Sequence, residues 1–399
     1  MRESRNEAYW IAAQSGVTPL AVAIPGMAKT ASVESFSNKM DYRCYTMIGS
    51  IRDPADIGGF PDKASEKTVD AKGNIREEFY MKICPPEYVM NAIKGSVVGE
   101  KWVIFFDELT TCPPAVQAAM LRVIAEGVVG DTKLPENTLM LAAANPPGIA
   151  ANGFEIEPPM ANRLCHLQWE MEWDDWDEGM RSGLVFPSPS FPKLPKNWRN
   201  RLPGVGNLFA AFRKHMPTKF EPERDGTGGI KLDRNQLGGA WPSPRSITNA
   251  CIVRAAAESV NADKGIIAQL VAGCAGQGFE HTLDTWETNL DLPDPEETLA
   301  GAALALKKNE NVKYKRPNRP DKVLAHLGAV VSCVLANNTD VRWHAAIAII
   351  ERAMEFDLEI CAMCAKPLVK PDIRPKNAAI PQEFVDRLLP TLMKAAGGK

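Results

Sequence analysis

The sequence predicts an α/β protein with a parallel-sheet core, followed by an all-helical lid and a C-terminal helical extension. Three observations support this fold class. An apolar run at 102–106 ends in two adjacent acids, Asp107 and Glu108. Residues 18–30 read as a second apolar strand, a Pro-Gly turn and the start of a helix. From residue 243 onward, apolar residues recur mostly with helical spacing.

The run from Trp102 to Phe106 is apolar at every position. Such a run is typical of a strand that is covered on both faces, as in a parallel sheet. Asp107 and Glu108 then stand at the carboxyl end of the strand, which is the edge where open parallel sheets bind ligands. The pair is interpreted as a metal-binding carboxylate followed by a carboxylate that polarises water. The alternative is a strand that stops at two solvated acids.

Residues 23–30 read A-I-P-G-M-A-K-T and have the strand-loop-helix context of a phosphate-binding loop. In such a loop the backbone N–H groups surround phosphate oxygens, a lysine reaches the β and γ phosphates, and a hydroxyl binds Mg²⁺. Lys29 and Thr30 stand where the lysine and the hydroxyl are required. The predicted nucleotide-binding residues are Pro25, Gly26, Met27, Ala28, Lys29, Thr30 and Ala31.

The loop departs from the G-x-x-x-x-G-K-[ST] pattern, because Ala23 and Ala28 replace both of its glycines and only Gly26 remains. If the backbone needs a positive φ at Ala28, the strain is about 1–2 kcal/mol, which a folded site can absorb. The alternative is a strand, turn and helix with an incidental lysine.

Together the two segments resemble the AAA+ ATPases, and most closely the MoxR branch with its magnesium-chelatase and gas-vesicle relatives. The resemblance covers roughly residues 15 to 260 and implies an AAA+ P-loop core. Four further segments contribute to it: DELTTCPPAVQAAMLRVIAEGVV, LMLAAANPP, PPMANRLCHLQWE and WPSPRSI. In similar proteins the first holds the Walker B acids, a double proline, and a helix that ends in a short hairpin.

The other three segments nominate one residue each by resemblance. Asn145 corresponds to sensor 1, Arg163 to the arginine finger that reaches the neighbouring subunit's nucleotide, and Arg245 to sensor 2. The alternatives are a turn residue, a surface salt-bridge partner and a residue without a role. Ser243 and Pro244 predict a helix N-cap and first helical residue. Arg245 would then lie in the first turn of the helix, where the helix dipole disfavours a positive charge. This favours the interpretation that Arg245 is there to bind a ligand.

The resemblance implies Mg²⁺-dependent ATP hydrolysis by a ring, expected to be a homo-hexamer, that remodels a protein partner. Thr30 and Asp107 would hold the metal, Lys29 would neutralise phosphate charge, Glu108 would polarise water and Asn145 would orient it. The suggested partner is a protein with a von Willebrand factor A-like domain. Two alternatives are a nucleotide-responsive scaffold with weak or no hydrolysis, and a nucleic-acid translocase.

The composition is that of an ordinary globular protein, with 399 residues, 45% hydrophobic residues and a net charge of −3. Because there is no basic field, binding to nucleic acid is not expected. The sequence contains neither a secretory signal nor an apolar run of membrane-spanning length, so we expect a cytoplasmic protein with no membrane partner. The nine cysteines form no repeating framework, so reduced thiols are expected.

Cys361 and Cys364 form one C-x-x-C pair inside an apolar helical pattern. Zinc would need two more ligands, so helix packing is favoured over a metal or redox site.

Residues 41–61 read as a second strand that leaves through a turn rich in Gly, Pro and Asp. The PADIGG segment at 54–59 matches a P-x-D-[IL]-x-G segment of the resembling family. Residues 61–79 are polar without an apolar period, so a mobile excursion is expected, with a surface hairpin as the alternative.

Trp169, Trp173 and Trp176 recur among six acids in 169–180. Core packing by Trp169 followed by a solvated acidic helix is favoured over an aromatic stripe that binds a partner.

Four regions are predicted from these patterns. The α/β core occupies 1–186, and a loop-rich connection with a short helix near 207–215 occupies 187–242. The helical lid with sensor 2 occupies 243–308, where Asp294 and Pro295 are the expected N-cap and first residue of a helix. The helical extension occupies 309–399.

Overall fold

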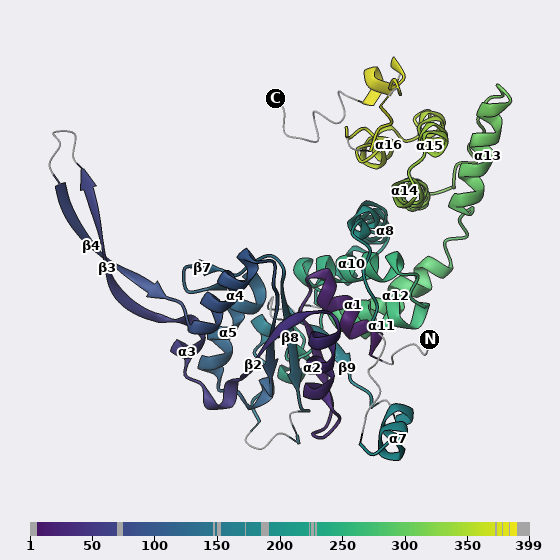
Figure 1. Ribbon diagram of the computed structural model, residues 1–399. Coiled ribbons are helices and arrows are strands. Elements are labelled where there is room, and N and C mark those ends of the chain that lie inside the picture. Colours follow the sequence, from purple (N-terminus) through teal and green to yellow (C-terminus); the bar gives the residue numbers. More distant parts are fainter. Residues whose placement is uncertain are drawn as a thin grey trace. The chain divides into compact units, whose positions relative to one another are not determined.

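The computed structural model in Figure 1 describes most of the chain. The described residues are 6–69, 75–146, 148–149, 153–171, 173–184, 191–222, 224, 227, 230–371, 373–376, 378–382 and 384–388. The chain divides into two compact units. Unit 1 comprises Met1–Lys193, Arg224–Asn249 and Ala272–Gly276, and unit 2 comprises Leu194–Glu223, Ala250–Val271 and Gln277–Lys399.

The centre of unit 1 is a five-stranded parallel sheet, which confirms the predicted fold class. Its order is β2-β5-β8-β1-β9, with β2 at Tyr42–Ile48, β5 at Lys101–Asp107, β8 at Thr138–Ala144, β1 at Pro19–Val22 and β9 at Cys165–Gln168. The register pairs Ile48 with Asp107, Phe106 with Ala142, and Val22 with Ala144. The residues that follow β1, β5 and β8 therefore meet at one edge of the sheet.

Strand β5 is buried on both faces, as its continuous apolar run predicts. Ile104 and Phe106 pack in a core with helices α4 (Glu87–Val97) and α5 (Pro114–Glu126). Helices α1 (Glu7–Ser15) and α2 (Lys29–Lys39) contribute a second aromatic group, in which the rings of Trp10 and Phe36 stack at 4.5 Å. Helix α1 had no counterpart in the sequence analysis. The sheet is thus a rigid platform for the residues at its carboxyl edge.

The polar segment after β2 is a hairpin, so the expected mobile excursion is wrong over its described residues. Strands β3 (Phe60–Val69) and β4 (Ile75–Cys84) pair antiparallel and project from the sheet (Figure 1). The PADIGG segment before them forms the short helix α3 (Pro54–Gly58). Gly59 has a φ of 90°, and a Cβ there would collide with the carbonyl oxygen of Cys84, so the hairpin requires glycine at this position.

The short hairpin implied after α5 is present as β6 (Val128–Val129) and β7 (Thr132–Lys133). Trp169 is buried directly after β9, as expected, and the exposed acidic helix α7 (Trp173–Arg181) follows. Trp173 and Trp176 are exposed on that helix, so the alternative of an aromatic stripe that binds a partner stays open. Helix α6 (Pro158–Ala161) precedes β9.

Unit 2 is helical. Its helices are α8 (Leu202–His215), α12 (Gln277–Thr288), α13 (Pro295–Lys307), α14 (Pro320–Ala336), α15 (Asp340–Ala353) and α16 (Leu358–Ala365), together with parts of α10 (Pro244–Ser259) and α11 (Lys264–Ala275). The Oδ1 of Asp294 accepts hydrogen bonds from the backbone N–H groups of Glu296 and Glu297, which confirms this N-cap. Buried Cys361 and Cys364 both lie in α16, as expected.

The observed units differ from the predicted regions in two respects. Helix α8 is much longer than the short helix expected within 187–242, and it packs along α14. Residues 250–271 and 277–308 share a compact unit with the extension, whereas a separate lid was expected. Residues 187–190 of the predicted connection and residues 389–399 of the predicted helical extension lie outside the described residues. Within the described part of the chain, no helix is both long and apolar enough to cross a bilayer.

Candidate phosphate-binding site

Lys29 is the first residue of α2, and its side chain points back toward the preceding strand. Its Nζ donates hydrogen bonds to the carbonyl oxygens of Ala23 at 2.8 Å and Ile24 at 3.2 Å, and to Asn145 Oδ1 at 3.0 Å. The residue is only 9% exposed. All three ammonium donors are therefore in use, and a phosphate oxygen would bind Lys29 by replacing one of these acceptors.

Burial lowers the pKa of Lys29, while the negative charges of Asp107 and Glu108 act in the opposite direction. The ammonium group thus lies close to Asp107, the last residue of β5, and to Glu108, which follows it. A cation held this near the sheet edge is placed to neutralise an anionic ligand.

The loop before α2 has the strained backbone that the sequence anticipated. Gly26 has a φ of 85°, and Ala28 has a φ of 55° and a ψ of 24°, which is the left-handed region. The indole N–H of Trp169 donates to the carbonyl oxygen of Met27 at 2.9 Å. Trp169, a buried residue directly after β9, therefore holds the middle of this loop in place through a hydrogen bond. The first backbone N–H groups of α2 follow Ala28, and such groups commonly bind anions.

Thr30 and Asp107 are brought together from opposite sides of the site. The Thr30 hydroxyl donates to Asp107 Oδ2 at 2.7 Å, although β8 separates the strands that lead to these residues. A hydroxyl and a carboxylate are hard oxygen ligands, and Mg²⁺ is commonly held by one or two such groups together with waters and substrate phosphates. The residues present therefore fit the predicted magnesium site.

Glu108 has a φ of 55°, so the chain turns sharply where β5 ends. Its backbone N–H donates to Asp107 Oδ1 at 2.9 Å, which fixes the orientation of the neighbouring carboxylate. A left-handed backbone at a non-glycine residue is strained, and such strain concentrates at functional sites.

Asn145 follows β8 and is held by Thr110, a residue that sequence reasoning did not identify. The Thr110 hydroxyl donates to the backbone carbonyl of Asn145 at 3.0 Å, and the backbone N–H of Asn145 lies 3.3 Å from the same hydroxyl oxygen. The side-chain amide remains directed at Lys29. Trp169 and Thr110 support the site through a backbone carbonyl and a hydroxyl, and no spacing rule in the sequence marks either role.

Arg163 and Arg245 lie near each other. Burial and the positive charge of Arg245 both lower the pKa of Arg163, while Glu126 opposes them. Arg163 Nη1 donates to the carbonyl oxygen of Pro159 at 2.5 Å, and its Nε is buried without a partner among the described residues. No hydrogen bond between described residues joins either arginine to the group formed by Lys29, Thr30, Asp107 and Asn145.

The segment before Arg245 is tied to the segment before Arg163 through Asn162. Ser243 Oγ donates to Asn162 Oδ1 at 2.7 Å, and Asn162 Nδ2 donates to the carbonyl oxygen of Trp241 at 3.2 Å. Ser243 Oγ also accepts the backbone N–H of Ser246 at 3.1 Å, which confirms the predicted N-cap of α10.

A cavity of about 620 Å³ lies at the same sheet edge in unit 1. Its lining includes Val22, Thr110, Asn145, Glu155 and His166. Burial lowers the pKa of His166, while its 2.9 Å contact with the carbonyl oxygen of Ala161 acts in the opposite direction. Of the predicted site residues, all of which the structure describes, only Asn145 is among those that line this cavity.

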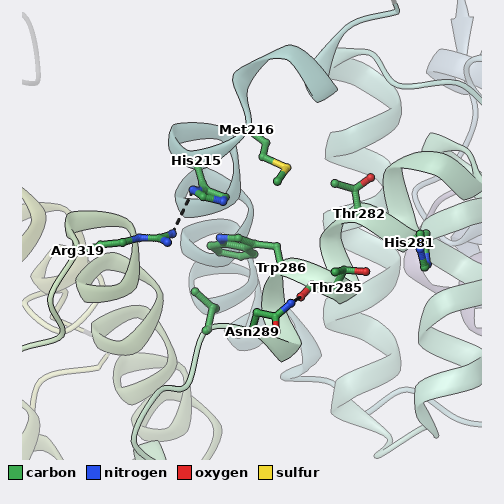
Figure 2. Close-up of a pocket in the computed structure, with 9 residues that line it drawn as sticks. His215, Met216, His281, Thr282, Thr285, Trp286, Asn289 and Arg319 are labelled. Atoms are coloured by element: carbon green, nitrogen blue, oxygen red, sulfur yellow. Dashed lines mark hydrogen bonds between the residues drawn. The ribbon is translucent and has the colours of Figure 1, made fainter.

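Unit 2 contains a separate cavity of about 330 Å³ (Figure 2). The rings of His215 and Trp286 stack with centroids 6.2 Å apart, and Arg319 Nη2 lies 3.1 Å from His215 Nδ1. Arg319 is also paired with Asp321. Because these polar groups already satisfy one another, the cavity is assigned no ligand.

No protein-family model and no curated protein matches this sequence. Among solved structures, the chain is similar to a candidate ATPase from Cytophaga hutchinsonii ATCC 33406, with 20% identity, coverage of 68% of this chain and 80% of that one, and a TM-score of 0.41. It is also similar to a full-length MCM homologue from Methanopyrus kandleri, with 14% identity, coverage of 67% and 54%, and a TM-score of 0.30. These likenesses are too distant to support a functional argument.

Proposed function

We propose that this chain is a ring-forming, MoxR-like AAA+ ATPase that hydrolyses ATP with Mg²⁺ and remodels a protein partner. One observation carries the proposal. Lys29, Thr30, Asp107 and Asn145 stand at or after the carboxyl ends of three different strands, and hydrogen bonds hold them together at one sheet edge. A lysine, a hydroxyl, a carboxylate and an amide in that arrangement supply the groups that phosphoryl transfer needs.

The strained loop from Pro25 to Ala28 and the first N–H groups of α2 would bind the phosphates. Lys29 would exchange a carbonyl acceptor for a phosphate oxygen and neutralise charge that develops during transfer. Ala31 would contribute its backbone N–H in the first turn of α2.

Thr30 and Asp107 would hold Mg²⁺, and the bound ion would neutralise negative charge on the phosphates. Glu108 would accept a proton from the attacking water. Asn145 would orient that water through its side-chain amide, with Thr110 fixing its backbone. The hydrogen bond between Thr30 and Asp107 in the structure keeps both ligands in place.

Arg163 would act on the nucleotide of a neighbouring copy in a homo-hexamer, and Arg245 would act as sensor 2. Two facts support an anionic ligand near this pair. Burial and the positive charge of Arg245 lower the pKa of Arg163, and Arg163 Nε is buried without a partner among the described residues. An unpaired buried donor is costly, and a phosphate oxygen would satisfy it.

The proposed partner is a protein with a von Willebrand factor A-like domain, a suggestion that rests on the resemblance to MoxR proteins. Coupling would require that partner binding and nucleotide state share one conformational equilibrium. A partner that co-purifies with the chain and changes its ATPase rate would support this assignment.

The test separates nucleotide binding from hydrolysis. Lys29→Ala should abolish binding of a fluorescent ATP analogue, whereas Glu108→Gln should bind it and release no phosphate. Lys39→Ala, an exposed lysine at the end of the same helix, is the matched control and should behave like wild type. Phosphate release by Glu108→Gln at the wild-type rate would refute the assignment. Binding without turnover in wild type would instead favour the scaffold, and turnover stimulated only by nucleic acid would favour the translocase.

A further inference from the structure

Two elements of unit 1 project from the sheet without extensive packing against other described elements: the β3–β4 hairpin and helix α7 (Figure 1). A lone two-stranded hairpin is marginally stable in water, and so is an isolated helix of fewer than about 12 residues. Helix α7 has 9 residues. Both elements would gain stability from a surface that covers them.

One face of the hairpin combines apolar side chains with lysines. The register places Lys63 opposite Met81, Ser65 opposite Phe79 and Lys67 opposite Glu77, and strand alternation puts these six residues on one face. Phe79 is 59% exposed and Met81 is 68% exposed. The ammonium group of Lys63 lies 3.8 Å from the centroid of the Phe79 ring. We call this surface the lysine face.

Helix α7 presents an apolar stripe flanked by acids. Trp173, Trp176 and Met180 recur at helical spacing, so they share one side of the helix. Trp173 is 55% exposed, and the two indole rings meet edge to face at 5.9 Å. Asp177 lies beside the stripe, and Asp174 lies further round the same flank of the helix, past Arg181. We call this surface the tryptophan face.

The two faces belong to opposite edges of the parallel sheet. The hairpin follows β2 through α3, and α7 follows β9, while β2 and β9 are the two edge strands. When one copy contacts the next through two different surfaces, every copy can use both. Such a heterologous contact extends from copy to copy and closes into a ring if the rotation permits.

We propose that the tryptophan face of one copy docks on the lysine face of the next. Aromatic and thioether side chains would form the apolar centre of the contact, and aspartates of α7 would meet lysines of the hairpin at its rim. This docking contact rests on the proposed function in one respect, which is that the copies are expected to form a ring. The contact itself uses no residue of the phosphate-binding site.

Charge reversal tests the pairing. Lys63→Glu/Lys67→Glu and Asp174→Lys/Asp177→Lys should each weaken self-association by about tenfold or more in sedimentation velocity at low salt. Mixing the two variants, or combining all four changes in one chain, should restore most of the association. Lys307→Glu/Lys308→Glu reverses two exposed lysines of unit 2 and is the matched control, which should sediment like wild type. Circular dichroism of every variant checks that it is folded.

A photo-crosslinking residue at position 176 identifies what the helix touches. In a mixture of isotopically heavy and light chains, the expected product joins position 176 of one copy to residues 60–69 or 75–84 of the other. The same residue at exposed Phe356 should give no such product. Unchanged sedimentation of the reversed variants, or crosslinks confined to one chain or to other proteins, would overturn the proposal. ATP binding by the same variants tells whether the proposed function survives that result.

Discussion

Individual residues at the sheet edge are strained or buried in ways that predict measurable effects. Ala28 carries a left-handed backbone, so Ala28→Gly should relieve about 1–2 kcal/mol of strain. The added freedom of the unfolded chain offsets about 0.4–1 kcal/mol of this gain. We therefore expect unchanged or raised stability in chemical denaturation. Ala31→Gly, inside α2, should lose about 1 kcal/mol instead. Equal destabilisation by both substitutions would contradict the strain at Ala28.

His166 predicts a pH dependence of stability. Burial lowers its folded-state pKa below the ordinary value of about 6.5, so the unfolded chain binds the proton more tightly. Its contribution to stability is therefore present above pH 6.5 and is lost as the pH falls toward the folded-state pKa. When the pH is lowered from about 7.5 to about 5.5, the melting temperature of His166→Gln should fall by less than that of wild type. His344→Gln, at an exposed position, should keep the wild-type dependence.

At the scale of elements, β9 supports the phosphate-binding loop through Trp169. Trp169→Phe keeps the aromatic packing but removes the donor to the Met27 carbonyl, a hydrogen bond that contributes about 0.5–1.5 kcal/mol. We expect nucleotide affinity to fall by up to about tenfold, because the loop must then be ordered by the ligand. Trp198→Phe, at a buried tryptophan of unit 2, is the matched control. Affinity that stays the same in Trp169→Phe would show that the loop needs no such support.

The same scale shows what sequence could and could not predict. The β5 strand, the loop before Lys29 and the N-caps at Ser243 and Asp294 follow from local chemistry, and the structure contains them. Sequence alone favours a mobile excursion over the hairpin, its alternative, because the described residues of the ribbon are mostly exposed on both sides and residues 61–79 therefore show no apolar period. The support from Trp169 and Thr110 depends on strands distant in sequence, so no local pattern encodes it.

At the scale of the whole molecule, the chain does not divide where its composition changes. Residues 272–276, at the end of α11, belong to unit 1, and a Cβ at Gly273 would press on the carbonyl oxygen of His166 in β9. One helix end therefore packs on the sheet while the rest of the helix belongs to unit 2. This division of α11 between the two units depends on tertiary contacts. The order of strands and helices along the chain therefore could not predict it.

We propose that Glu108 of one copy and Arg163 of another complete a single hydrolytic site. An arginine supplied from a neighbour can contribute about 10³–10⁵ in rate, so Arg163→Ala and Glu108→Gln should each be inactive alone. A mixed assembly contains interfaces in which both residues are native. The decisive measurement is phosphate release from a mixture of the two variants, with exchange of subunits verified by mass. We predict that hydrolysis reappears on mixing, and a mixture that exchanges subunits yet stays inactive would contradict the claim.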